Sequence, residues 1–420
     1  MAAKLQAPRG TFDVLPRAGK RRELLREEAD DILGRAGYGP FESPVFEDTE
    51  LFARGVGQST DIVQKEMFSF EDKAGRSLTL RPEGTAGACR SYIENGMHKL
   101  AQPVKLRYWG PFFRHEAPQA GRYRQFNQVG AEALGSDDPS LDAELIVLLA
   151  ELLESCGVIS RLRLSSLGNS ETRATYGEEL RAHLLAREGE LSDEIRARID
   201  ANPLRAFDSD HEGTRAVMAD APLLTDQLDA VDAQHFADVR ALLDEVGQPY
   251  ELDPTLVRGL DYYTRTVFEF DSPSLGAQSG VGGGGRYDGL VEQLGGPPTP
   301  GVGWAAGIER ILLADTEGEL DGLELAPVFI AIAKPEAARM AFTVARELRR
   351  AGESVQMEQA GRSFKGQLKQ ANRIGADKVV IVGDEVEVKD MESGDQTVAG
   401  DFGEVLALVH ANENLDLEGP

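Results

Sequence analysis

The sequence of 420 residues is poor in cysteine and in long apolar runs. Its two cysteines, Cys89 and Cys156, form no CxxC pair, which excludes a disulfide scaffold and a zinc–thiolate site and fits a reducing compartment. The longest apolar run, around residues 145–153, is interrupted by Glu151 and is too short to span a bilayer. The N-terminus lacks the apolar segment of a signal peptide. We therefore expect a cytoplasmic protein with no membrane association.

Lysine is also scarce. Only eleven of the 45 basic residues are lysine, and 71 acidic residues give a formal net charge of −26 at pH 7. This balance argues against a generic polyanion binder, although a local basic patch could still bind nucleic acid. An acidic, lysine-poor surface favours adaptation to high salt, because a Debye length of about 3 Å near 1 M salt screens self-repulsion. An ordinary acidic enzyme is the alternative.

The length predicts two to four domains, and 41% hydrophobic residues can form a sizeable core. Over the first part of the chain, helical periodicity and strand-like alternation are mixed. Helices are expected at 20–36, 85–98 and 138–156, and mainly antiparallel strands at 77–81, 104–113, 123–133, 161–165 and 262–270. The glycine-rich stretch 280–289 is expected to lead into helices at 287–294 and 304–315.

The rest of the pattern predicts the domain organisation. Residues 170–247 are highly charged and helical in pattern, which indicates a helical insertion within a domain formed by 1–169 and 248–318. A polar linker is expected at 319–326. Residues 327–420 then alternate between strands and helices, which is typical of a small α/β domain with a mostly parallel sheet. The predicted fold class is α+β, with an antiparallel-sheet first domain, a helical insertion and a C-terminal α/β domain.

The strand at 123–133 holds the most informative candidate site. With a period of two, Phe126, Gln128, Gly130 and Glu132 share one face. An aromatic ring, an amide, a bare position and a carboxylate then form a row, and the glycine would leave room for a ligand. An ordinary half-exposed strand is the alternative.

The loop before this strand carries Arg114, Glu116, Gln119 and Arg122. Two strands joined by an arginine-bearing loop could clamp a polyphosphate, because guanidinium groups bind phosphate oxygens bidentately. The alternative is a charged hairpin tip.

Two further clusters stand at strand ends. Glu83 and Thr85 open a helix, where the carboxylate could accept a hydrogen bond from an ammonium group or could cap the helix. Arg258, Tyr262 and Tyr263 form a polar cluster before the strand at 262–270; packed structural tyrosines are the alternative.

The sequence does not support either of two common nucleotide-binding motifs. The glycines of 280–285 satisfy GxGxxG, but the parallel βαβ unit of a dinucleotide site is missing. No GxxxxGK[ST] occurs, which excludes a P-loop.

Taken in order, these blocks resemble the class II aminoacyl-tRNA synthetases, and specifically the histidyl-tRNA synthetase family. RGTFD at 9–13 resembles the N-terminal signature of the family. The other matching segments are ESPVFEDTELF (motif 1, the dimer interface), FRHEAPQAGRYRQFNQVGAE (motif 2), GVGWAAGIERILL (motif 3), and LVRGLDYYTRTVFEF with GGGGRYDGL, which resemble the two histidyl-specific segments.

The resemblance implies a cytoplasmic homodimer that uses ATP with Mg²⁺, L-histidine and tRNA(His). Its fold would be an antiparallel-sheet catalytic domain with a helical insertion and a C-terminal anticodon-binding domain. Histidine would be activated to histidyl-adenylate and then transferred to the 3′ end of the tRNA. The first step needs no side-chain base, since the histidine carboxylate is already ionised, and depends on positioning and charge stabilisation.

The resemblance also implies residue roles. Arg258, Arg114 and Arg310 would be catalytic. Matching positions for histidine are Glu83, Thr85 and Gln128 at the amino group, Glu132, Tyr262 and Tyr263 at the imidazole, and Arg114 and Arg258 at the carboxylate. Those for ATP are Arg114, Glu116, Arg122, Phe126 and Arg310, with Phe126 on the adenine. Those for tRNA are Gln119 and Arg124 at the acceptor end. The sequence of the C-terminal domain itself also predicts a basic stripe that could bind tRNA, formed by Arg346, Arg349, Arg350, Arg362, Lys365, Lys369, Arg373 and Lys378. Solvated helix faces are the alternative. No set of metal ligands from the protein is expected.

Three alternatives remain at this stage. The first is the non-catalytic regulatory subunit of ATP phosphoribosyltransferase, a relative that would lack the C-terminal domain and tends to lose the arginine cluster. The second is a class II synthetase for another amino acid, against which the RGLDYYT segment argues. The third is a pure RNA-binding protein, which would not need Arg310.

Overall fold

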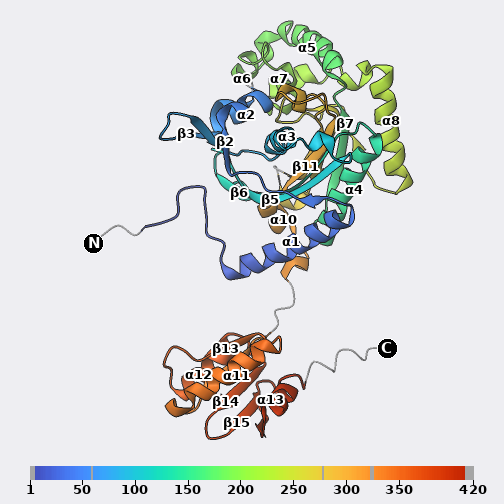
Figure 1. Cartoon of the computed structure of the whole chain (residues 1–420). Helices are drawn as coiled ribbons and strands as arrows, with labels where there is room; N and C mark the ends of the chain where they lie inside the picture. The colour runs from blue at the N-terminus through green and yellow to red at the C-terminus, as the bar shows by residue number, and fades with distance from the viewer. Residues whose placement is uncertain (1–4, 58–59, 277–278, 322–325, 412–420) are drawn as a thin grey trace. The chain divides into compact units, whose positions relative to one another are not determined.

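The computed structural model describes residues 5–57, 60–276, 279–321 and 326–411, which divide into two compact units on either side of residue 322. In the described part of the first unit, the main sheet has the strand order β1-β5-β6-β11-β10-β9-β7-β8 (Figure 1). It is antiparallel except at its outer pairs, β1–β5 and β7–β8. The bounds are β1 Gly39–Pro40, β5 Val104–Phe113, β6 Gln125–Leu134, β7 Arg161–Ser166, β8 Glu251–Leu252, β9 Thr264–Asp271, β10 Gly280–Arg286 and β11 Gly301–Gly307.

A smaller antiparallel sheet has the order β2-β4-β3. Its strands are β2 Phe46–Asp48, β3 Phe68–Glu71 and β4 Ser77–Leu80. The helices of the first unit are α1 Pro16–Arg35, α2 Thr49–Gly55, α3 Thr85–Glu94, α4 Pro139–Ser155, α5 Ser170–Leu185, α6 Asp193–Arg196, α7 Glu212–Met218, α8 Ala230–Glu245, α9 Leu290–Gln293 and α10 Ile308–Ala314.

The sequence prediction is wrong in the glycine-rich region. Residues 280–286 form a central strand, residues 301–307 form another, and the helix expected at 304–315 begins only at Ile308. The helix expected at 287–294 is reduced to the short α9. Glycine and alanine are weak strand formers, but here their small size lets β10 and β11 pair closely with each other and with β9 and β6.

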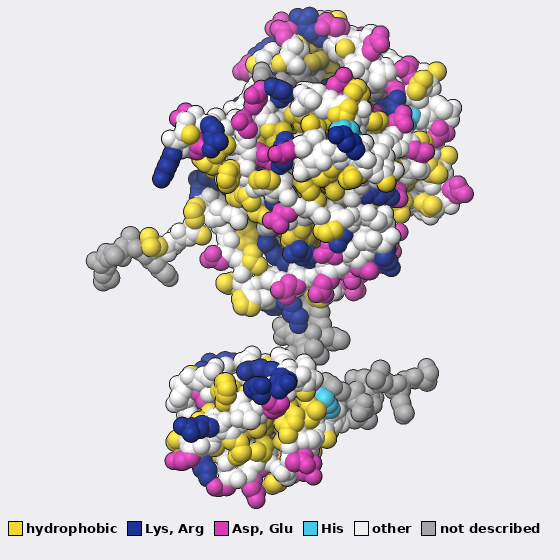
Figure 2. Space-filling view, in the orientation of Figure 1, with side chains coloured by type: hydrophobic (Ala, Val, Ile, Leu, Met, Phe, Trp, Pro, Cys, Tyr) yellow, Lys and Arg dark blue, Asp and Glu magenta, His cyan; other side chains and the backbone are white. Residues whose placement is uncertain are grey.

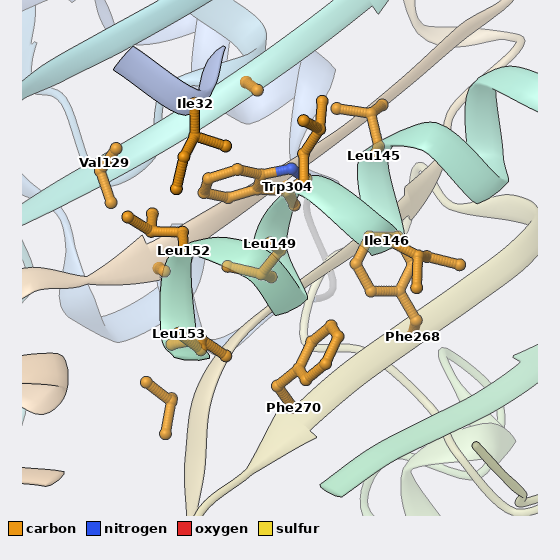
Figure 3. Close-up of a cluster of buried hydrophobic side chains, with 14 of the residues drawn as sticks. Ile32, Val129, Leu145, Ile146, Leu149, Leu152, Leu153, Phe268, Phe270 and Trp304 are labelled. Carbon is orange, nitrogen blue, oxygen red and sulfur yellow. The ribbon is translucent and has the colours of Figure 1, made fainter. Parts of the chain in front are cut away.

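One large hydrophobic core cluster of the first unit lies on one face of the main sheet, under α1, α4 and α10, and a second involves α3 and α5. Figure 3 shows Leu145, Leu149 and Leu152 of α4 pointing towards Trp304 of β11. Burying one such side chain contributes about 1.5–3 kcal/mol. Alternation along β6 and β11 sends Val129, Ala131 and Trp304 into this core, so the intervening residues face the opposite side of the sheet.

Helices α5, α6 and α7 follow β7 and lie together in Figure 1, whereas α8 packs on α4 and adds Phe236, Val239 and Leu243 to the core. Asp142 of α4 contacts α8: its carboxylate accepts hydrogen bonds from buried Arg286 and lies 3.3 Å from His235 Nε2 of α8. Of the linker expected at 319–326, residues 319–321 form a 3₁₀ turn and Leu320 is buried in the core, while 322–325 lie outside the described residues.

The second unit has a five-stranded sheet of order β13-β12-β14-β15-β16. The first three strands are parallel, as predicted from the alternating pattern, and the last two are antiparallel. The bounds are β12 Val328–Ile332, β13 Val355–Met357, β14 Lys378–Val382, β15 Val386–Asp390, β16 Gln396–Ala399, α11 Ala338–Arg350, α12 Phe364–Arg373 and α13 Phe402–Val409. The sequence pattern predicts a last helix at 402–412; it is observed as α13, and residue 412 lies outside the described residues.

On the face of the first unit seen in Figure 2, acidic and basic side chains are interspersed. Within the described ranges, no helix combines the length and the apolar character needed to cross a membrane.

Candidate active site

A cavity of about 610 Å³ opens on the face of the main sheet opposite α4. This volume is in the range of small-molecule sites. The β5–β6 hairpin, the segment 253–263, strands β9 to β11 and helix α10 all contribute to its walls. The residues expected at the site that line it are Glu83, Thr85, Arg114, Glu116, Arg122, Phe126, Gln128, Arg258, Tyr262, Tyr263 and Arg310.

Glu132 lies beneath this cavity and is fully buried. Its Oε1 accepts a hydrogen bond of 2.7 Å from Thr85 Oγ1, and its Oε2 accepts one of 2.6 Å from the hydroxyl of Tyr287. Gly303 on the neighbouring strand makes room for the carboxylate, because a Cβ there would lie 1.8 Å from Glu132 Oε2. Burial raises the pKa of Glu132 to about 8, which the two hydroxyl donors only partly oppose.

The predicted role of Gly130 is wrong. A Cβ at this position would lie 2.3 Å from the Tyr108 ring, so the space above Gly130 is filled by a side chain of β5 and is not open to a ligand. Sequence alternation on β5 places Tyr108 on this face.

Glu83 is a second buried carboxylate, at the start of α3. It accepts hydrogen bonds from the backbone N–H groups of Thr85 (2.7 Å) and Ala86 (2.9 Å), so it does cap the helix. The hydroxyl of Tyr262 lies 3.4 Å from its Oε2. Burial raises the pKa of Glu83, and the backbone donors oppose that shift. Glu83 therefore both caps α3 and lines the cavity.

The cavity is also lined by arginines. Arg114 Nε donates to Pro82 O (3.0 Å), and its guanidinium lies 5.4 Å from the centroid of the Phe126 ring. Arg310 donates to the carbonyl of Gly280. Its pKa is lowered by burial and by the positive charge of Arg122, an arrangement that a polyanion would stabilise.

Arg258 also reaches the cavity. Its guanidinium forms an ion pair with Glu269 of β9. It lies against Gly283 of β10, where a Cβ would be 3.1 Å from Arg258 Nη2. The lack of a side chain at Gly283 therefore leaves room for the Arg258 guanidinium against the strand.

Buried carboxyl groups and a group of arginines therefore meet at one cavity. A model of the histidyl-tRNA synthetase family matches residues 10–311. The chain belongs to the histidyl-tRNA synthetase family. An anticodon-binding domain model matches residues 327–412.

Relatives in this family are similar over nearly the whole chain. Histidine–tRNA ligase of Rubrobacter xylanophilus is 48% identical over 409 residues, covering 93% of this chain and 95% of that protein. That of Streptomyces avermitilis is 47% identical over 417 residues, covering 97% and 98%. The crystal structure of apo S. aureus histidyl-tRNA synthetase superposes with a TM-score of 0.79 at 37% identity, covering 97% of this chain and 99% of the other. The fold is thus that of a class II synthetase core with a C-terminal anticodon-binding domain.

The residues expected to contact tRNA lie outside the cavity lining. Gln119 and Arg122 exchange backbone hydrogen bonds in the hairpin loop, and Arg124 Nε donates to Glu116 O (3.4 Å). In the second unit, three exposed cations follow at every fourth position of α12, namely Lys365, Lys369 and Arg373, and Arg362 precedes them, paired with Glu358 at 3.2 Å. Lys378, expected in the same basic stripe, is instead buried against Asp390.

Tyr287 was not singled out, although the GGGGRYDGL segment contains it. Its pattern alone does not distinguish it from a core tyrosine, since its partner Glu132 is 155 positions away in the sequence. Asn127 does lie on the opposite face from the cavity, as alternation predicts, and its Nδ2 donates to Glu309 Oε1 (2.9 Å).

Proposed function

We infer that this chain is a histidine–tRNA ligase. The observation that carries the inference is a cavity lined by a group of arginines and by the hydroxyl groups of Thr85 and Tyr287, which donate to the buried carboxyl group of Glu132. An imidazole, an amino acid carboxylate and a triphosphate need these two kinds of environment side by side.

The reaction has two transfers. The histidine carboxylate oxygen attacks the α-phosphorus of ATP, the bond to the β-phosphate oxygen breaks, and pyrophosphate leaves. A ribose hydroxyl at the 3′ end of tRNA(His) then attacks the carbonyl carbon of histidyl-adenylate, and AMP leaves. The first transfer is accelerated by positioning of the reactants and by stabilisation of the charge on the pentacoordinate phosphorus. Arginine side chains can provide both.

We propose that histidine binds beside the buried carboxyl groups of Glu83 and Glu132. Glu83, Thr85 and Gln128 would hold its amino group, while Glu132 and Tyr263, with Tyr262 beside them, would bind the imidazole. A site that hydrogen-bonds a substrate N–H rejects analogues without it by about 10⁴–10⁵. Such discrimination would make an editing step unnecessary.

We propose that ATP binds at the arginines that line the cavity. Arg114 and Arg258 would contact the α-phosphate and the histidine carboxylate, and Arg310 the γ-phosphate. Arg122 and Glu116 would border the polyphosphate, with the adenine on Phe126. Mg²⁺, which lowers the negative charge of the triphosphate, would accompany ATP.

The proposed domains follow the function. Residues 1–169 and 248–318 would form the catalytic domain, 170–247 the insertion, 319–326 the linker and 327–420 the anticodon-binding domain. The cations on α12 and Arg362 would contact the tRNA anticodon region, and Gln119 and Arg124 its acceptor end. A cytoplasmic location accords with this substrate.

We also propose a homodimer formed at the small sheet. Phe46 and Phe70 are about half exposed there, and their ring centroids lie 6.3 Å apart, so a second copy would cover an apolar pair. Light scattering at micromolar concentration is expected to give the mass of a dimer. A monomer at that concentration would contradict the proposal.

Amino-acid-dependent ATP–pyrophosphate exchange tests the function. With each of the twenty amino acids in turn, we expect exchange with histidine alone. Repeating the assay at low and at molar KCl tests the proposed salt adaptation, for which activity should be retained or rise with salt. Folded protein without exchange at either salt concentration would favour the regulatory relative.

A further inference from the structure

The segment 253–263, which carries Arg258, Tyr262 and Tyr263, has no regular secondary structure. Few of its backbone groups bond to its own residues or to the sheet. Asp261 N, for example, donates to Val56 O (3.2 Å), which belongs to neither. Buried carbonyl groups need donors, so such a segment depends on its neighbours for a defined conformation.

The helical insertion supplies these donors. Arg173, in the first turn of α5, donates to the carbonyls of Tyr263 and, at 2.6 Å, of Asp261. Arg205 Nη2 donates to Gly259 O (3.0 Å), and Asn202 Nδ2 donates to Asp261 Oδ1 (2.9 Å).

Arg173 is the central member of this group. One guanidinium bridges two carbonyls on either side of Tyr262, so it fixes the turn from which both tyrosine side chains reach the cavity. It is partly buried and does not line the cavity that holds the proposed substrates, so it would act through the segment and not on the ligand.

We propose that Arg173 of the insertion is a positioning residue for histidine recognition, acting through the backbone of Asp261 and Tyr263. The proposal rests on the proposed function and deepens it: the insertion is part of the amino acid site. Loss of the two hydrogen bonds would leave Tyr262 and Tyr263 mobile beside the imidazole, while Arg114 and Arg310, which lie outside this segment, stay in place for ATP.

The test compares R173M, which keeps length but removes the donors, with R173K, which can reach only one carbonyl at a time. The matched control is R181M on the same helix, where the exposed Arg181 pairs with Asp200 at 2.6 Å. Histidine affinity is measured by calorimetry without ATP, the KM values for histidine and ATP by pyrophosphate exchange, and folding by thermal melting.

For R173M we expect histidine binding at least tenfold weaker and a matching rise in the KM for histidine, with the KM for ATP within twofold of wild type. R173K should lie between, and R181M should match wild type. A folded R173M with unchanged histidine affinity, or with equal rises in both KM values, would overturn the proposal. If R173M does not fold, R173K decides by the same criteria. A wild-type chain that neither binds nor activates histidine would instead refute the proposed function.

Discussion

Replacing Arg258 by alanine is expected to lower histidine-dependent ATP–pyrophosphate exchange by about 10²–10³-fold. The physical reason is that one preorganised donor at the developing charge typically contributes about 3–4 kcal/mol to transition-state stabilisation. Arg258 lines the cavity, rests on the bare strand at Gly283 and is held by Glu269. We expect the loss to appear mainly in kcat, measured by exchange at saturating histidine and ATP.

The control for this change is R161A, at the exposed start of β7 on the same sheet. It should leave exchange unchanged, and both variants should melt as cooperatively as the wild type. Near-normal exchange in a folded R258A protein would remove this residue from the proposed catalytic group.

The second large effect concerns Glu132 and pH. The pKa of Glu132 is raised from 4.5 to about 8 by burial, and Glu83 adds repulsion. Between these two values the folded chain keeps a proton that the unfolded chain has released. The stabilisation from this group is therefore complete below pH 4.5 and is lost as pH rises through 8. Relative to E132Q, the free energy of unfolding of the wild type should fall by about 3–4 kcal/mol between pH 5 and pH 8.

Urea unfolding of both proteins across this pH range measures the difference. The groups that face Glu132 are the hydroxyls of Thr85, Tyr287 and Tyr108 and the carboxyl of Glu83, and E132Q leaves all of them in place. E251Q, at an exposed position of β8, is the matched control and should follow the wild type. Parallel curves for wild type and E132Q would mean that Glu132 titrates normally.

The sequence predicts much of the fold because the informative patterns are local. Helix α4 and strand β5 were expected within one or two residues of their observed bounds, since each carries a full period of apolar residues. Strand β11 was not predicted, because Gly301–Gly307 consists mostly of glycine and alanine, which are weak strand formers, and runs directly into the helical pattern of α10. Its conformation comes from pairing with β10 and β6, which are remote or equally glycine-rich.

The same distinction applies to the candidate site. The motifs predicted Glu83, Arg114 and Arg258 as site residues, and all three line one cavity. The residues that fix the site from outside were not predicted, because such contacts join remote positions. Arg173 and Tyr263, for example, are 90 positions apart. Nothing in the local sequence of α5 marks Arg173 among the other charged residues of the insertion.

The distribution of aromatic residues has a practical consequence for spectroscopy. Both tryptophans, Trp109 and Trp304, and all the tyrosines lie before residue 323, so the second unit holds neither type. Trp304 sits in the core strand whose neighbours Gly303 and Ala305 line the cavity. Intrinsic fluorescence excited at 280 nm therefore reports on the synthetase core alone. Unfolding of the anticodon-binding unit would be optically silent in such a melt, and following it requires circular dichroism, calorimetry or a tryptophan introduced beyond residue 326.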